Sequence, residues 1–479
     1  MNLFATKSLA RITAESESGT HQLKKTLGAF NLVALGIGAI IGAGLFSLTG
    51  IAAADHAGPA VVLSFVVAAI GCAFAGMCYS EFSTMIPIAG SAYTYAYATM
   101  GELLAWIIGW DLVLEYAVGA ATVSVSWSSY VVKLLHSFSI ELPSSLIHCP
   151  WDTIPGIINL PAVLIVCAIS VLLMIGTSES AQFNAIVVVI KVSIVIVVIC
   201  VGYQYVNPAN YVPFIPENTG KMGEFGYSGI MRAAGVIFFA YIGFDAVSTA
   251  AQEAKKPQRD MPIGIIGSLA ICTVLYILFA RVLTGMVPYR TFHGDASPVA
   301  TVINLFPYPW LRTVIVVGII CGYTSVILVM LLGQSRVFYS MSRDGLLPHT
   351  FSDIHPKWKT PYRCNMIFMV FVSLFSGFLP ISKLGEMTSI GTLLAFVIVC
   401  IGIIVMRKTN PNAPRPYRTP LVPLVPILGV IVCFAMMAFL DWETWMRLFI
   451  WLAIGLLIYF LYSRHHSHLA TDNAGKPRR

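Results

Sequence analysis

Long apolar segments alternate with short polar connections along almost the whole chain. A bilayer core about 30 Å thick is crossed by a helix of about 20 mostly apolar residues, so segments of this length predict membrane-spanning helices. The strict alternation of apolar and polar residues that a transmembrane barrel requires is absent from the sequence. The segments predict twelve spans, near residues 29–50, 60–86, 101–131, 160–178, 183–206, 228–251, 262–286, 311–340, 364–380, 386–406, 423–440 and 446–463.

Composition supports an all-α polytopic membrane protein and excludes the main soluble classes. Hydrophobic residues make up 57% of the 479 residues and charged residues only 11%, against roughly a quarter charged in soluble proteins. The net charge of +7 comes from basic residues dispersed over the connections, so no nucleic-acid partner is expected. The ten cysteines are scattered without a CxxC pair, so we expect no metal site and no cofactor. The connections are too short for an enzymatic domain, and the protein is therefore not expected to be an enzyme.

Lys and Arg concentrate in every second connection, which predicts the orientation of the chain. Lys255, Lys256, Arg259 and Arg343 fall on the side that holds the N-terminus, and the opposite side is poor in basic residues. Because cytoplasmic loops retain positive charge during insertion, both termini are expected in the cytoplasm and the protein in the inner (plasma) membrane. The polar start of the chain is not typical of a cleaved signal peptide.

Glycines cluster in the middle of the first span, which reads LGIGAIIGAGLF and contains Gly36, Gly38, Gly42 and Gly44. Gly38 and Gly42 alone form a GxxxG pair, which is typical of a helix-packing face. A packing face does not require the further glycine at position 44, so the cluster also favours an opened turn. Unpaired backbone groups at membrane depth are tolerated only inside the protein or along a cavity.

The sixth span contains a matching glycine at the centre of FFAYIGFDAVST. Gly243 lies between Phe239 and Asp245, and the first and sixth spans correspond if spans one to five and six to ten are inverted repeats. Paired interruptions at corresponding positions indicate a transporter binding site. Freed amides favour an anion and freed carbonyls favour a cation. Together they predict a receptor for the carboxylate and ammonium of an α-amino acid.

Four motifs follow one another along the chain in the order typical of a known transporter family. They are GAIIGAGLF at 38–46, PIAGSAYTYAYATMGE at 87–102, FFAYIGFDAVSTAAQEAKKPQRDMPIGI at 238–265 and QSRVFYSMSRDGLLP at 334–348. With them the sequence resembles the amino acid–polyamine–organocation family, and within it the bacterial relatives of cationic amino acid transporters. The resemblance implies the LeuT-like fold, in which helices 1 and 6 are discontinuous. It implies a cytoplasmic N-terminal segment at 1–28 and two inverted five-helix repeats at 29–206 and 228–406. Two peripheral helices at 423–463 and a cytoplasmic tail at 464–479 follow.

The resemblance also assigns residues to the two charged groups of the substrate. It gives the carboxylate to the backbone amides of Gly42, Ala43 and Gly44. Many relatives have Ser or Thr in place of Ala43, and here only the amide remains. Phe239 takes the position of an aromatic gate over the substrate. The ammonium is assigned to the carbonyls around Ile40, Phe239, Ala240 and Ile242.

Lys191 lies in the fifth span within FNAIVVVIKVSIVIVV, far from a charged neighbour in sequence. One interpretation is that its side chain reaches the cytoplasmic interface, but at ~1.5 Å per residue the span end is roughly 12 Å away. The other interpretation is a proton carrier beside the broken first span, because a buried amine loses its proton more easily than one in water. Proton-coupled members of the family have a lysine at this position, which implies the second interpretation.

Asp111 and Glu115 lie four residues apart in the third span and therefore share a helix face. They form either a structural pair bonded to neighbouring hydroxyls and bases, or part of the substrate pocket. In the pocket, Glu115 would exchange a proton or attract a basic side chain.

These features predict a secondary active transporter that takes up α-amino acids by proton symport through alternating access. The alternative within the same fold is an amino acid exchanger. A channel lacks a filter motif, and an intramembrane protease lacks a histidine well inside a span. The expected partners are the amino acid, protons and membrane lipid, and a small membrane subunit is left open. Backbone groups recognise only the common zwitterion, so cationic and small neutral substrates both fit.

Overall fold

The computed structural model describes most of the chain at the level of individual residues. The predicted N-terminal segment and C-terminal tail fall mostly outside the described residues, as does part of the 87–102 motif. The described residues are 5–7, 27–86, 91–152, 154–176 and 181–469.

Helices form nearly all of the described chain, and their starts are placed by the prolines and polar residues between apolar segments. Pro257, Pro298 and Pro309 each begin a helix, where a missing N–H costs nothing. The helices are α2 (Ala29–Ile40), α3 (Thr49–Ala52), α4 (Val61–Met85), α5 (Ser91–Thr99), α6 (Glu102–Val113), α7 (Gly119–Ser137), α8 (Leu160–Ile175), α9 (Ala181–Gly202), α10 (Gly226–Ile237), α11 (Ala246–Thr249), α12 (Pro257–Met286), α13 (Pro298–Val302), α14 (Pro309–Arg343), α15 (Tyr362–Phe378), α16 (Ile381–Thr409), α17 (Leu424–Ala438), α18 (Trp442–Ile458) and α19 (Arg464–His466).

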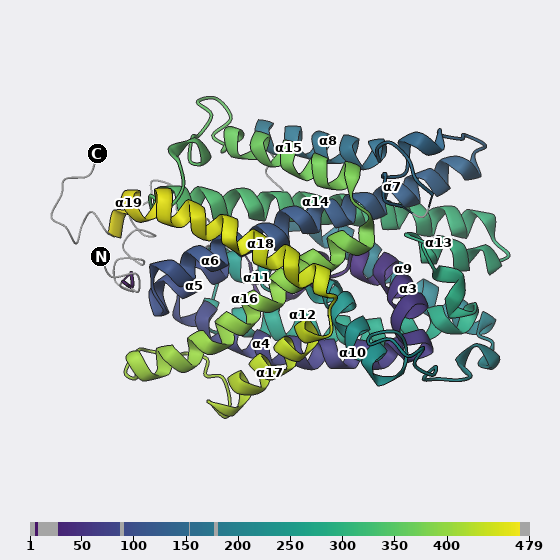
Figure 1. The fold of residues 1–479 in the computed structure, drawn as a ribbon, viewed down its shortest axis with the longest axis horizontal. Coiled ribbons are helices and arrows are strands. Elements are labelled where there is room, and N and C mark those ends of the chain that lie inside the picture. The colour runs from purple at the N-terminus through teal and green to yellow at the C-terminus, as the bar shows by residue number, and fades with distance from the viewer. Residues whose placement is uncertain (1–4, 8–26, 87–90, 153, 177–180, 470–479) are drawn as a thin grey trace.

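The prediction of an all-helical, polytopic membrane protein is confirmed. Within the described ranges there is no β-strand, and eight helical segments are long and apolar enough to cross a membrane. Shorter apolar helices, namely α2, α8, α15 and α17, occupy four further predicted spans. The helices lie roughly along the long axis of the molecule, with α13 at one end and α19 at the other (Figure 1).

Both described ends of the chain lie at the same end of the molecule. The Lys7 ammonium lies 2.8 Å from a carboxylate oxygen of Asp344, and the backbone N–H of His468 donates to the carbonyl of Asp344 at 3.1 Å. An even number of membrane crossings gives this arrangement.

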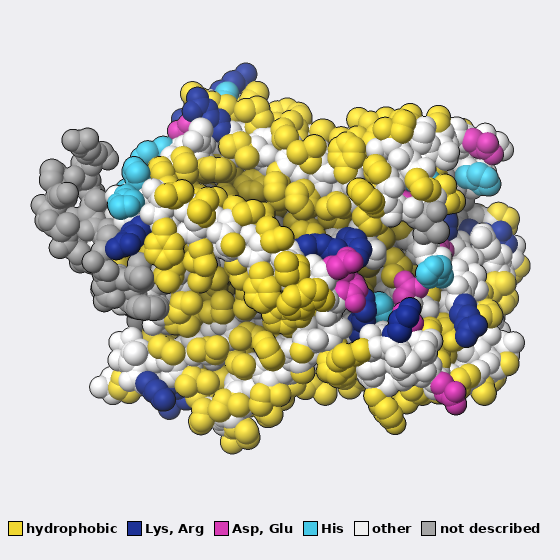
Figure 2. Space-filling model, in the orientation of Figure 1, with side chains coloured by type: hydrophobic (Ala, Val, Ile, Leu, Met, Phe, Trp, Pro, Cys, Tyr) yellow, Lys and Arg dark blue, Asp and Glu magenta, His cyan; other side chains and the backbone are white. Residues whose placement is uncertain are grey.

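The surface and the interior show the reverse of the pattern found in soluble proteins. Large apolar side chains such as Leu164, Val189 and Val274 are exposed, whereas Glu115, Asp245 and other polar side chains are buried. Hydrophobic side chains cover most of the visible face, with a group of charged side chains near its middle and others toward both ends of the long axis (Figure 2). Lipid contact explains the apolar surface, and the buried charges mark the interior as the place of function.

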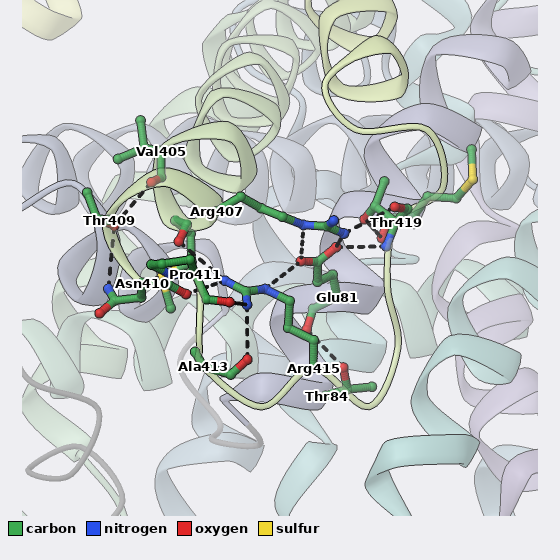
Figure 3. A network of polar contacts seen from close by, with 12 residues as sticks. Glu81, Thr84, Val405, Arg407, Thr409, Asn410, Pro411, Ala413, Arg415 and Thr419 are labelled. Carbon is green, nitrogen blue, oxygen red and sulfur yellow. Dashed lines mark hydrogen bonds and ion pairs between the residues drawn. The ribbon is translucent and has the colours of Figure 1, made fainter.

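A buried carboxylate ties the connection between α16 and α17 to α4 (Figure 3). Arg407 donates to both carboxylate oxygens of Glu81, at 3.0 and 2.8 Å, and Arg415 lies 3.3 Å from the same group. The backbone N–H of Thr419 donates to Glu81 at 2.7 Å. Both oxygens of this carboxylate are therefore paired, as a fully buried charge requires.

A further ion pair joins α7 to the segment before α13. The Lys133 ammonium lies 3.0 Å from a carboxylate oxygen of Asp295, which also accepts the backbone N–H of Ser297 at 2.9 Å. Burial alone would raise the pKa of Asp295, but the Lys133 charge and the hydrogen bonds from Thr301 and Ser297 outweigh burial and hold this pKa below its ordinary value.

Candidate functional site

The first predicted span is interrupted at its glycine cluster. α2 ends at Ile40, and Ile41 has extended backbone with φ −72° and ψ 106°. Helical structure resumes in a π-helical turn, Gly44–Leu48, in which the amides of Leu45 and Phe46 both donate to the carbonyl of Gly42 at 3.2 Å. The amides around Gly42 therefore stand at the beginning of the second helical part, where intrahelical acceptors run out.

The sixth span is interrupted in the same manner. α10 tightens into a 3₁₀ turn, Phe238–Tyr241, and Ile242 then has extended backbone with φ −58° and ψ 136°. Gly243 has φ +116°, a conformation that side chains rarely permit, and helical structure resumes at Ala246. A Cβ on Gly243 would lie 2.8 Å from the carbonyl carbon of Ala39, so glycine is required for space as well.

The two interruptions lie against each other. A Cβ placed on Gly44 would lie 2.2 Å from the Cα of Ala240, so the two backbones touch there. Ile40, Ala43, Phe239, Ala240 and Ile242 are all buried. The structure thus brings together residues of both interruptions, Gly44 and Ala240 among them, that the resemblance assigned to the substrate.

A tyrosine that the sequence analysis missed lies on this junction. The hydroxyl of Tyr276, on α12, lies 2.9 Å from the carbonyl oxygen of Ile40 and 2.9 Å from that of Ala240. Its ring packs between Phe65, at 5.5 Å, and Tyr241, at 5.3 Å between centroids. A single tyrosine in an apolar span has no sequence signal that separates it from packing aromatics; only its contact with two carbonyls does.

Lys191 lies beside the first interruption and not at a membrane interface. Its ammonium donates to the carbonyl of Gly38 at 2.7 Å, and the residue is 1% exposed. The stem packs on α14, where a Cβ at Gly322 would lie 3.1 Å from the Lys191 Cε. Glycine at 322 leaves room for the stem.

The three acids Asp111, Glu115 and Asp245, here called the acid cluster, are buried beside the second interruption. Asp245 accepts a hydrogen bond from the Tyr116 hydroxyl at 3.0 Å and lies directly before α11. The carboxylate oxygens of Asp111 and Glu115 have no hydrogen-bond partner among the described residues. The polar side chains around Glu115 are those of Asp245, Asp111 and Thr392.

Uncharged polar side chains in the described part of the chain are also buried without a hydrogen bond. They include the hydroxyls of Tyr79, Tyr95 and Ser248 and the amide of Gln334. Asp245 and Glu115 are the acids that face Tyr79. Buried polar groups are nearly always bonded, so these groups point to water or a ligand in the working protein. The sequence analysis found the acids and missed their uncharged neighbours.

The N-terminal end of the first interrupted helix is also joined to the C-terminal end of the other. Leu27, just before α2, forms a short parallel β-bridge with Ala254. The N–H of Leu27 donates to the carbonyl of Glu253 at 2.9 Å, and the N–H of Lys255 donates to the carbonyl of Leu27 at 2.8 Å. The first part of one helix and the last part of the other are therefore held as one unit.

Interrupted helices that meet in a charged interior define a membrane transport protein. The chain matches the amino acid permease family over residues 27–462 and belongs to it. This match confirms the family resemblance found in the four motifs.

Several characterised proteins are similar over most of their length. The branched-chain amino acid permease BcaP of Bacillus subtilis (strain 168) is 45% identical over 471 residues, covering 98% of this chain and 99% of the relative. The methylthioribose transporter of the same organism is 44% identical over 469 residues, covering 98% and 99%. Cationic amino acid transporter 4 of Homo sapiens is 34% identical over 407 residues, covering 82% and 62%. All three names denote transport proteins and none an enzyme.

Proposed function

We propose that this protein takes up α-amino acids by proton symport, through alternating access around the junction of the two interrupted helices. The observation that carries the proposal is this junction, where amides of one helix and carbonyls of both converge beside a buried lysine. The amides of Gly42, Ala43 and Gly44 would bind the carboxylate. Freed carbonyls of both helices would bind the ammonium.

The fold that best accounts for this junction is the LeuT-like fold with twelve spans. α2 has 12 residues, α10 has 12 before its 3₁₀ turn, and each leads into an interruption, which supports an inverted repeat of 29–206 on 228–406. Residues 423–463 would then form two peripheral helices. Both termini would face the cytoplasm, with the protein in the plasma membrane and lipid around its apolar surface.

Lys191 and Glu115 are the proposed proton-coupling groups. Proton binding at Lys191 changes the charge on a group bonded to Gly38, two residues from the end of α2. Such a change biases the first interruption toward one arrangement, which is how an ion and a substrate are linked. Glu115 offers a second protonatable group, close to Asp245 and the second interruption.

The names of the similar proteins specify different substrates, so the identity of the substrate must be tested directly. BcaP suggests branched-chain amino acids, and the methylthioribose transporter suggests a sugar that has neither carboxylate nor ammonium. The convergence of amides and carbonyls favours an amino acid. Thermal-shift measurements with the twenty amino acids and methylthioribose identify the ligand class, because a ligand stabilises the state it binds.

Transport by purified protein in liposomes tests the mechanism. With an inward proton gradient and no internal substrate, a symporter accumulates the labelled amino acid, whereas a strict exchanger takes up none. Accumulation that ignores the proton gradient, or that requires internal substrate, would overturn proton symport.

Lys191→Ala separates coupling from substrate recognition. We expect proton-driven accumulation to fall to the level of protein-free liposomes, while exchange in preloaded liposomes continues. Lys383→Ala is the matched control, because Lys383 is a surface lysine paired with Glu443. Undiminished proton-driven accumulation in the Lys191 variant would remove this residue from the mechanism.

A further inference from the structure

Tyr276 stands at a point where carbonyl oxygens of both interrupted helices converge. Its hydroxyl is 2.9 Å from the carbonyl oxygens of Ile40 and Ala240, which belong to different helices. The residue itself is fully buried. Rings of Phe65 and Tyr241 pack on it, so the position of the hydroxyl is fixed by aromatic contacts and not by the hydrogen bonds alone.

A count of donors at this point leaves one bond unmade. A phenol carries a single hydrogen, so it donates fully to only one of the two carbonyls at a time. The other carbonyl then faces an oxygen lone pair, and its lost bond with water is not replaced. A ligand with several N–H groups would supply the missing donors.

We propose that Tyr276 is a positioning residue for the substrate ammonium. It holds the carbonyls of Ile40 and Ala240 beside each other and adds its own oxygen as a third acceptor. Three converging acceptors match the three N–H groups of a primary ammonium, and hydrogen bonds to a charged donor are about twice as strong as neutral ones. The inference deepens the proposed function and rests on it, because it assumes an amino acid at the junction.

Selectivity for the ammonium provides the test. The first ligand is the amino acid that most stabilises the unsubstituted protein among the twenty. The second is the carboxylic acid of the same carbon skeleton without the amino group, such as 4-methylpentanoate for leucine. In Tyr276→Phe we expect the affinity for the amino acid to fall about tenfold, the value of one hydrogen bond to a charged group, and the affinity for the carboxylic acid to stay unchanged.

Tyr241→Phe is the matched control. It removes a buried hydroxyl from the same aromatic group, but that hydroxyl donates to Phe65 at 3.1 Å and not to either carbonyl at the junction. Its affinities for both ligands should equal those of the unsubstituted protein. Equal affinity in Tyr276→Phe, or equal losses for both ligands, or the same loss in Tyr241→Phe, would overturn the inference.

A second variant keeps the test decisive if Tyr276→Phe does not fold. Incorporation of 4-aminophenylalanine at position 276 keeps the ring packing and supplies two N–H donors, one for each carbonyl. Both carbonyls then have a donor without the ligand, and the amine nitrogen is a weaker acceptor than the Tyr276 oxygen. We therefore expect a folded protein with lowered affinity for the amino acid. Unchanged affinity would contradict the inference. If no amino acid stabilises the unsubstituted protein, the proposed function itself fails, which is a different result.

Discussion

Two groups of buried carboxylates are treated in opposite ways by this protein. Glu81 accepts hydrogen bonds from Arg407 and the Thr419 amide and pairs with Arg415, so both of its oxygens are bonded. Glu115 and Asp111 are equally buried, and their oxygens have no hydrogen-bond partner among the residues that the structure describes. Burial alone therefore does not distinguish these carboxylates, whereas the completeness of their hydrogen bonding does, and we propose that the incompletely bonded acids are the ones that act in transport.

The difference follows from the cost of burying charge. A carboxylate anion inside a protein is stable only when bases and hydrogen bonds replace its water, and Glu81 has both. An incompletely bonded acid is retained only where water, a proton or a ligand completes it during the working cycle. Glu81 braces the end of α4 against α16, whereas the acid cluster adjoins the helix interruptions and has unbonded capacity.

The largest expected effect comes from breaking the saturated site. Glu81→Ala leaves two arginines without their shared acid, so we expect the free energy of unfolding to fall by about 3–5 kcal/mol. Thermal unfolding of the detergent-purified protein measures this loss as a lower Tm. In the matched control, Glu443→Ala removes an exposed acid that pairs with Lys383 and Arg447, and the loss should be under about 1 kcal/mol. Similar Tm changes in both variants would show that the bonding of Glu81 is not structural.

The acid cluster should respond in the opposite manner. Glu115→Gln keeps the shape of the side chain and removes its ability to take up a proton, so stability should change by less than about 1 kcal/mol. The proton dependence of uptake, measured in liposomes over a series of external pH values, should weaken or disappear.

Glu102→Gln is the control for Glu115→Gln, because Glu102 is also buried but accepts bonds from Tyr97 and Tyr459, both at 3.1 Å. It should lose stability and retain proton-dependent uptake. A large stability loss in Glu115→Gln with unchanged proton dependence would reverse the comparison and make Glu115 a structural acid.

The sequence carried the positions of the helices and of their interruptions, because both depend on local composition. Apolar length predicted each span, and Gly44 and Gly243 are glycines since no larger residue fits against Ala240 and Ala39. The burial of Lys191 followed from its distance to any span end. These inferences needed no knowledge of which helices are neighbours.

The remaining parts of the site depend on contacts between distant segments, which local pattern does not encode. Tyr276 reaches the carbonyl of Ile40 across 236 positions of sequence, and Arg407 reaches Glu81 across 326. The unbonded hydroxyls around the acid cluster are likewise a property of the assembled interior. Sequence composition identifies a charged residue in a span as exceptional, but it does not separate a functional tyrosine or glutamine from one that only packs.

An intermediate case refines the comparison. Asp295 pairs with Lys133 and accepts three further hydrogen bonds, two from Ser297 and one from Thr301. Its side chain is 17% exposed, so water partly screens the pair. Its lowered pKa means that the folded protein holds the ionised form more tightly than the unfolded chain does. The resulting stability is present above the unfolded pKa of about 3.9 and is lost as the pH falls through the lower folded value.

Asp295→Asn should therefore cost about 1 kcal/mol or less at pH 7, and the difference in Tm from the unsubstituted protein should shrink as the pH is lowered below about 4. Glu141→Gln, at an exposed acid four residues past the end of α7, should show no such pH-dependent difference. Thermal unfolding at a series of pH values measures both variants. A Tm difference as large at pH 3 as at pH 7 would mean that Asp295 contributes through shape and not through charge. The loss of stability should be smaller than that of Glu81→Ala, because Asp295 pairs with one base where Glu81 pairs with two, and because Asp295 is less isolated from water.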